Sequence, residues 1–434
     1  MIEIIKNPAE SEWKALCQRA NVDDEVIDAR VRNILTRVKE GGDNALKTLT
    51  QEIDGSCPAN FLVSEDEFEK AAAEVPQTLK DAIQTAKTNI ETFHRNEIAA
   101  PFEVQTMPGV ICKRRMVPVR RVGLYIPGGS APLFSTILML ATPAKLAGCP
   151  EIILCTPCDK QGNVSPVVLW TARLCGVSTI YKLGGAQAIA AMAYGTETIR
   201  SVHKIFGPGN RYVTKAKQYV STQGVAIDMP AGPSEIMVLA DETANPAFIA
   251  ADMLSQAEHG PDSQAIVVCA NDRFAESINK ELDRQLKQLP RASIATKALQ
   301  NSRIIVFETS DREKQKELYI RFANTYASEH LIIETKEPWE IASQISAAGS
   351  VFIGHYSPES AGDYASGTNH TLPTMGLATS FGGIGVDSFM HAISYQELSP
   401  QGLNGLSKTI IEMAEAEGLE AHAHAVKIRV GKSN

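Results

Sequence analysis

The sequence predicts an α/β protein with two doubly wound parallel sheets and helical segments at both ends of the chain. Two observations lead to this fold class. Short runs of β-type residues alternate with helical stretches in two successive series, which is typical of parallel strands joined by crossover helices. The first hundred residues and the tail instead show apolar residues at helical spacing.

The first hundred residues are expected to form helices. Apolar residues recur at helical spacing before a break at Gly41-Gly42; they are Ile27, Val31, Ile34, Leu35 and Val38. Ser64, with Glu67 three residues later, is a capping-box pattern that predicts the start of another helix. Residues 77–96 continue in the same style.

Strands are expected in two series. The first series comprises residues 121–126, 151–155, 179–183, 203–206 and 226–228. The second comprises residues 235–240, 265–269, 303–307, 331–333 and 351–353. Helical texture returns from Leu403 onward. Helical ends that complete neither sheet could pack on a partner chain, so we expect a dimer.

Composition excludes several classes of protein. The 434 residues carry 42 Lys and Arg against 50 Asp and Glu, a formal net charge of −8, which argues against a nucleic-acid binder with a basic face. The most apolar stretch, residues 131–144, is too short to cross a membrane. The N-terminus lacks the pattern of a signal peptide, so the eight cysteines indicate reduced thiols in the cytoplasm.

Glycine turns follow three of the expected strands. They are Gly128-Gly129, Gly184-Gly185 and Gly207-Pro208-Gly209. Nucleotides bind beyond the carboxyl ends of such strands, yet none of these turns matches G-x-G-x-x-G. A tight turn is therefore the simpler interpretation of any one of them. The pair Cys155 and Cys158 has C-x-x-C spacing but no second pair to complete a zinc ribbon, and we assign it a structural role.

Polar residues at strand and helix ends are the candidates for chemistry. Gln256 and His259 lie three apart, on one face at the end of an expected helix that Gly260 stops. Glu329-His330 directly precedes a strand, where imidazole and carboxylate can share proton transfer, although an incidental polar pair explains them equally well.

Two further candidate segments lie towards the C-terminus. Residues 357–370 form a polar loop inside a domain and offer Asp363 and His370 as contacts, unless the loop is only a solvated surface. Glu417 and His422 lie in the tail, where a solvated role is the simpler reading of each alone.

Taken together, these segments resemble a known family. The blocks, in order, are VGLYIPGGSAPLFST, GGAQAIAA, FGPGN, DMPAGPSE, SQAEHGPDSQ, SEHL and SPESAGDYASGTNHTLPT. They are similar to the signature blocks of the L-histidinol dehydrogenase family, and the resemblance runs from about residue 25 to residue 428. It implies a homodimeric, zinc-containing enzyme that oxidises L-histidinol through L-histidinal to L-histidine with two NAD⁺, the last steps of histidine biosynthesis.

The resemblance also implies a division of the chain. An N-terminal extension (1–24) precedes a first α/β domain (25–108 with 236–384) that carries most zinc and substrate residues. A crossover segment (109–128) leads to a second, Rossmann-like α/β domain (129–235) with the NAD contacts. A C-terminal helical tail (385–434) is expected to reach the partner subunit in an intertwined homodimer.

Site residues are implied by motif position. The zinc ligands would be Gln256, His259, Asp363 and, from the other subunit, His422; these four would also contact substrate. His330 would act as the base for both hydride transfers and contact substrate, while Glu329 would activate water for the aldehyde step. The remaining substrate contacts would be Ser234, His370 and Glu417. The NAD contacts would be Tyr125, Gln187 and Asn210, beside the glycine turns.

One departure and three rival functions remain open. His424 beside His422 could in principle take over as the tail ligand, and residues 381–385 (FGGIG) receive no role. A paralogous zinc- and NAD-dependent dehydrogenase of another polar alcohol would not need Glu417, His422 and His370, which are all present. A zinc hydrolase would not need the glycine turns after the strands. A non-catalytic metal-binding protein would not need an acid–base pair.

Overall fold

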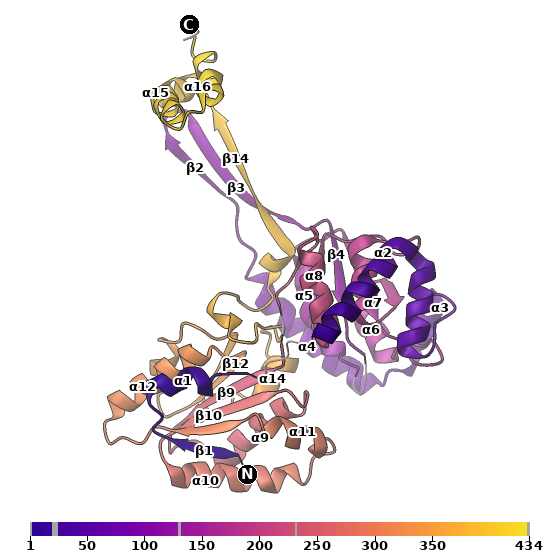
Figure 1. Ribbon diagram of the computed structural model, residues 1–434, viewed down its shortest axis with the longest axis vertical. Helices are drawn as coiled ribbons and strands as arrows, with labels where there is room; N and C mark the ends of the chain where they lie inside the picture. The colour runs from indigo at the N-terminus through magenta and orange to yellow at the C-terminus, as the bar shows by residue number, and fades with distance from the viewer. Residues whose placement is uncertain (1, 20–24, 129–131, 231, 432–434) are drawn as a thin grey trace.

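The computed structural model describes residues 2–19, 25–128, 132–230 and 232–431. It contains two α/β units and an arm that projects away from both of them (Figure 1). One unit is built on a five-stranded sheet and the other on a six-stranded sheet, and a three-stranded sheet forms the arm. Within these described ranges, no helix is long and apolar enough to cross a membrane.

The five-stranded sheet is parallel, with the strand order β6-β5-β4-β7-β8. Its strands are β4 (Arg121–Tyr125), β5 (Glu151–Thr156), β6 (Thr179–Lys182), β7 (Lys204–Phe206) and β8 (Ala226–Ile227). One face is covered by α3 (Glu65–Glu74), α4 (Gln77–Arg95), α5 (Phe134–Leu146) and α6 (Pro166–Leu174). The other face is covered by α2 (Glu25–Asp54), α7 (Gly185–Tyr194) and α8 (Arg211–Ser221).

The six-stranded sheet is also parallel, with the order β1-β11-β10-β9-β12-β13. Its strands are β1 (Glu3–Lys6), β9 (Glu235–Ala240), β10 (Gln264–Cys269), β11 (Arg303–Val306), β12 (His330–Glu334) and β13 (Ser350–Ile353). One face carries α9 (Pro246–Ala257), α10 (Asp272–Leu286) and α11 (Ala292–Leu299). The other carries α1 (Glu10–Leu16), α12 (Arg312–Tyr326) and α13 (Pro338–Ala342).

The central strands β9, β10 and β12 are buried along their whole length. Such burial on both faces explains why these strands are apolar runs rather than alternating patterns. After β13 the chain forms α14 (Glu359–Tyr364) and two 3-10 turns, η1 (Leu377–Thr379) and η2 (Val386–Phe389), before it enters the arm.

The arm is antiparallel, with β3 (Val110–Pro118) between β2 (Phe102–Met107) and β14 (Met390–Leu398). The helices α15 (Pro400–Ala416) and α16 (Glu420–Lys427) lie at its far end (Figure 1). Gly109 turns β2 into β3 with φ +78, and a Cβ there would overlap Ser399 and Gly402. This close approach fixes α15 on the tip of the hairpin.

The predicted strands all form, within one or two residues at their ends. The capping box of Ser64 and Glu67 is present at the start of α3. The break predicted at Gly41-Gly42 is a kink inside α2, where Gly42 adopts φ 51 and ψ −137. Glu197 holds that kink because its carboxylate accepts a hydrogen bond from the Asp43 amide at 2.8 Å.

The structure groups the segments differently from the predicted division. Residues 25–95 pack on the five-stranded sheet rather than with residues 236–384. Residues 3–6 of the extension form β1, at the edge of the six-stranded sheet. An apolar helix stripe fits either sheet equally well, so its partner is decided by tertiary packing.

Two further boundaries differ. The segment 109–128 holds all of β3 and all of β4, and β4 is the central strand of the five-stranded sheet. The tail 385–434 starts with η2 and the nine-residue strand β14 before it becomes helical. The residues of β14 are mostly exposed, so they show no apolar run that would mark a strand.

Candidate active site

The candidate site lies at the amino ends of strands β9 and β12. Glu235 is the first residue of β9 and His330 the first of β12, and the two strands are neighbours. The end of α9, with Gln256, and the short helix α14, with Glu359 and Asp363, meet them there. This is the opposite end from the one where ligands usually bind in doubly wound sheets.

His330 lies within a group of three carboxylates. Its Nδ1 lies 3.7 Å from Glu329 Oε2 and 3.5 Å from Glu359 Oε1. Its Nε2 lies 3.5 Å from Asp363 Oδ1 and has no closer hydrogen-bond partner in the described part of the chain. Burial lowers the pKa of His330, but the charges of Glu329, Glu359 and Asp363 outweigh it and raise the pKa to about 10.

Glu329 is buried beside this imidazole. Its Oε2 accepts a hydrogen bond from the backbone N–H of Glu235 at 2.9 Å. Burial raises the pKa of Glu329 to about 8, and the charge of His330 opposes that rise. A carboxyl group with a pKa near neutrality can exchange a proton with a nearby water, as general acid–base catalysis requires.

A cluster of metal-ligating groups adjoins the pair. The ligand atoms of His259, Glu359 and Asp363 all lie within 4.8 Å of one another. Burial lowers the pKa of His259, which favours the neutral imidazole that binds metals. Burial raises the pKa of Asp363, but His330, His370 and His259 together outweigh it and keep the pKa low.

The sequence reasoning missed Glu359. It is buried, and burial raises its pKa to about 7. Ser255 donates a hydrogen bond to its Oε2 at 2.8 Å. Glu359 and Asp363 are four residues apart on α14, so they share one helix face, and this spacing was the available signal. Gln256, a predicted zinc ligand, is fully buried with its side-chain amide against Glu359.

The predicted contacts of the polar loop lie beside this cluster. His370 donates from Nδ1 to the backbone oxygen of Asp363 at 2.8 Å. Its Nε2 lies 3.4 Å from Thr136 Oγ1, on the helix that follows β4. Asn369 donates to the backbone oxygen of Met139 at 2.7 Å. The loop therefore joins the two α/β units at the site. Ser234 directly precedes β9, next to Glu235.

Two predicted site residues lie far away in the same chain. Glu417 follows the last residue of α15 and His422 lies in α16, at the end of the arm (Figure 1). Both side chains are exposed. His424 also lies in α16, two residues from His422.

The three predicted NAD contacts lie on the five-stranded unit. Tyr125 ends β4, and its hydroxyl accepts a hydrogen bond from Gly185 N at 3.1 Å. Gln187 is fully buried and donates to Asp54 at 3.3 Å. Asn210 is exposed and caps α8, because its Oδ1 accepts from the amides of Tyr212 and Val213.

The loops that follow the strands border a cavity of about 640 Å³, whose lining includes Pro127, Gly128 and Pro157. The turn at Gly128 therefore borders this cavity, while Gly129 lies outside the described residues. Arg211, next to Asn210, pairs with Asp262 at 2.6 Å and so connects the turn at Gly207 to the segment after His259.

Two doubly wound sheets, a buried acid–base pair and a neighbouring cluster of metal-ligating groups define an α/β enzyme that carries out acid–base chemistry. Comparison with known proteins gives the family. The family model of histidinol dehydrogenase matches residues 17–430. Histidinol dehydrogenase of Bacteroides fragilis (strain YCH46) is 53% identical over 429 residues, covering 99% of each chain.

More distant relatives agree. Histidinol dehydrogenase of Vibrio cholerae is 48% identical and covers 98% of this chain and 97% of its own. The crystal structure of histidinol dehydrogenase from Elizabethkingia anophelis superposes with a TM-score of 0.95 at 49% identity, covering 99% of this chain and 98% of that one. The chain belongs to the histidinol dehydrogenase family.

Proposed function

We propose that this protein oxidises L-histidinol to L-histidine through L-histidinal, with two NAD⁺ and one water, as the last steps of histidine biosynthesis. The observation that carries this proposal is the buried pair of Glu329 and His330 beside the cluster of His259, Glu359 and Asp363. Family membership supports the same reaction. A two-step oxidation on one site needs one group for the alcohol proton and another for water, and the pair supplies both.

We assign zinc to this cluster. His259 and Asp363 offer nitrogen and carboxylate donors that suit zinc, and Gln256 lies next to Glu359 within reach of the same cluster. When bound, zinc would orient the substrate, and its charge would offset the carboxylates around His330, which would bring the pKa of that imidazole toward neutrality.

The protein's own groups move the protons. Nε2 of His330 takes the hydroxyl proton of histidinol as a hydride leaves the adjacent carbon for NAD⁺. The carboxylate of Glu329 then takes a proton from water as the water adds to the aldehyde. The His330 imidazolium returns its proton to the aldehyde oxygen during that addition. Its free Nε2 then takes a hydroxyl proton of the resulting hydrate as the second hydride leaves for a second NAD⁺. Burial of both side chains keeps bulk water away from the aldehyde.

We further propose that the site is completed by a second copy of the chain. Glu417 and His422 lie at the end of the arm, away from the site of their own chain (Figure 1). The arm exposes apolar side chains: Phe102 is 57% exposed and Met413 61%. In a homodimer these surfaces would be covered, and each arm would bring Glu417 to the substrate ammonium group and His422 to zinc.

We assign the NAD⁺ contacts to Tyr125, Gln187 and Asn210. These residues follow or border the carboxyl ends of β4, β6 and β7, where doubly wound sheets bind nucleotides. A cavity of about 640 Å³ borders the turn at Gly128, close in sequence to Tyr125, although none of the three residues lines it. We assign Ser234, which directly precedes β9, and His370, whose Nε2 lies 3.4 Å from Thr136 Oγ1 on α5, as substrate contacts. All eight cysteines are free thiols, which agrees with a cytoplasmic location.

The test is the amount of NADH formed from limiting L-histidinol by the zinc-loaded protein with excess NAD⁺. Two equivalents, with histidine as product, are expected. One equivalent would show that the aldehyde step is absent or that the aldehyde escapes. No NADH from histidinol would overturn the proposal in favour of another alcohol.

A further inference from the structure

A buried ion pair lies directly behind the candidate active site. Arg19 Nε lies 2.5 Å from Glu235 Oε2, and Arg19 Nη2 lies 3.1 Å from Oε1, so the contact is bidentate. The side chains are 11% and 1% exposed, respectively. The two residues are 216 positions apart in the chain, and the site assignment uses neither of them.

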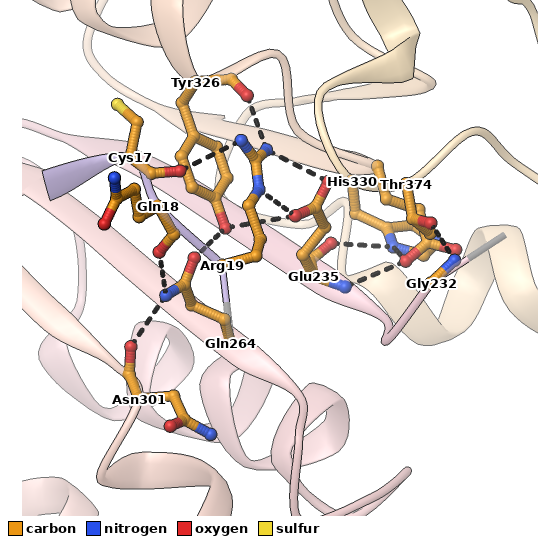
Figure 2. A network of polar contacts seen from close by, with 11 residues as sticks. Cys17, Gln18, Arg19, Gly232, Glu235, Gln264, Asn301, Tyr326, His330 and Thr374 are labelled. Atoms are coloured by element: carbon orange, nitrogen blue, oxygen red, sulfur yellow. Dashed lines mark hydrogen bonds and ion pairs between the residues drawn. The ribbon is translucent and has the colours of Figure 1, made fainter. Parts of the chain in front are cut away.

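Arg19 is held in one orientation on all sides (Figure 2). Its Nη1 donates to the backbone oxygen of Cys17 at 3.1 Å, and its Nη2 donates to that of Tyr326 at 2.5 Å. Its guanidinium carbon lies 3.9 Å from the centre of the Tyr326 ring. The Tyr326 hydroxyl in turn donates to Gln264 at 2.7 Å. A guanidinium with so many fixed partners holds the Glu235 carboxylate rigidly.

The main chain of Glu235 contacts both members of the acid–base pair. Its N–H donates to Glu329 Oε2 at 2.9 Å, and its carbonyl oxygen lies 3.4 Å from His330 Nδ1. A carbonyl oxygen can only accept a hydrogen bond, so Nδ1 keeps its hydrogen and Nε2 is the nitrogen that exchanges protons. One peptide segment therefore orients both side chains.

We propose that Arg19 is a positioning residue for the acid–base pair. The Arg19–Glu235 ion pair anchors the first residue of β9, and the main chain of Glu235 then orients Glu329 and His330. This inference rests on the proposed function, because it takes Glu329 and His330 to be the catalytic pair. A buried ion pair is weak evidence of a stabilising role, because an apolar pair of similar volume stabilises a fold equally well.

The test separates positioning from stability. Arg19→Met alone leaves the Glu235 charge buried without a partner and is expected to destabilise the protein. The double variant Arg19→Met with Glu235→Leu removes both charges, so its urea midpoint should return close to that of the parent. Its kcat for L-histidinal should nevertheless fall by about ten- to a hundredfold, with KM changed little, because a small misplacement of a reacting group costs up to about 10²-fold.

A second variant and a second readout keep the proposal testable if the double variant fails to fold. Arg19→Lys keeps the charge but loses the bidentate fork, so its kcat should be intermediate and its KM unchanged. Hydrogen exchange at the amide of residue 235 reports its bonds to Glu329 and to the side-chain oxygen of Gln256, 3.2 Å away, without any turnover. Exchange should accelerate in both variants while the rest of the unit keeps its protection.

The matched control is Arg312→Met with Glu337→Leu. These residues form a solvent-exposed ion pair, 63% and 48% exposed, outside the site, and their loss should change neither kcat nor exchange at residue 235. Parental kcat and parental exchange at residue 235 in a stable Arg19 variant would overturn the proposal. If the parent protein forms no NADH from histidinol but exchange accelerates as expected, the proposed function fails and the positioning role stands.

Discussion

Replacing Glu359 with Gln tests the carboxylate that sequence reasoning did not find. Three carboxylates raise the pKa of His330 from 6.5 to about 10 although burial lowers it. Shared equally, this rise is on the order of one pKa unit for each carboxylate. Glu359→Gln keeps the shape of the side chain and removes its charge. The pKa of His330 should therefore fall by one unit or more.

The assay is an NMR titration of the histidine rings in protein treated with EDTA, with His330→Asn to assign the resonance. Glu40→Gln, an exposed residue of α2, is the control and should leave the titration unchanged. Zinc affinity, measured by competition with a chelator, should also fall in Glu359→Gln, because the cluster loses a charged donor. A His330 pKa that stays within about 0.3 units of the parent value would refute the reasoning.

Three further predictions concern the acid–base pair, the five-stranded unit and the arm. His330→Asn should abolish both oxidations, whereas Glu329→Gln should mainly slow oxidation of added L-histidinal; equal loss in both half-reactions would contradict the division of roles. Lys217 and Asp228 form a buried ion pair at 2.5 Å, so Lys217→Met should lower the free energy of unfolding in urea by about 3–5 kcal/mol. The double variant Lys217→Met with Asp228→Asn should recover part of that loss. A Lys217→Met variant as stable as the parent would show that the pair contributes little. His422→Ala should lower the zinc content of the protein. A mixed dimer of one His422→Ala chain and one His330→Asn chain should regain activity if the site is shared, because one of its two sites is then intact. Mixed dimers without activity would exclude sharing.

Much of the fold follows from local patterns in the sequence. Apolar runs such as residues 235–240 and 265–269 predict β9 and β10, since central parallel strands are buried on both faces. The arm strands could not be predicted in this way. The apolar residues of β2 and β14, such as Phe102 and Val104, are mostly exposed and form no continuous run, and the two segments pair as strands on either side of β3.

The candidate site shows the same limit. Glu329, His330, His259 and Asp363 were predicted from polar residues at element ends and from motif position, and the fold brings them together. Glu359 lies in the same polar block, yet only the packing of α14 on α9 brings its carboxylate to His330. Arg19 lies outside every motif, and only the tertiary structure places it on Glu235.

The sequence by itself predicted the alternation of strands and helices, the candidate acid–base pair, the candidate metal donors and the family blocks, because each of these is a local pattern. The tertiary structure alone decided which helices cover which sheet, that the site lies at the amino ends of β9 and β12, and that Glu417 and His422 stand on an arm away from it. The physical reason is that periodicity records whether a face is buried but not what buries it. Contacts such as Arg19 with Glu235 join residues 216 positions apart, and no local pattern encodes such a pairing.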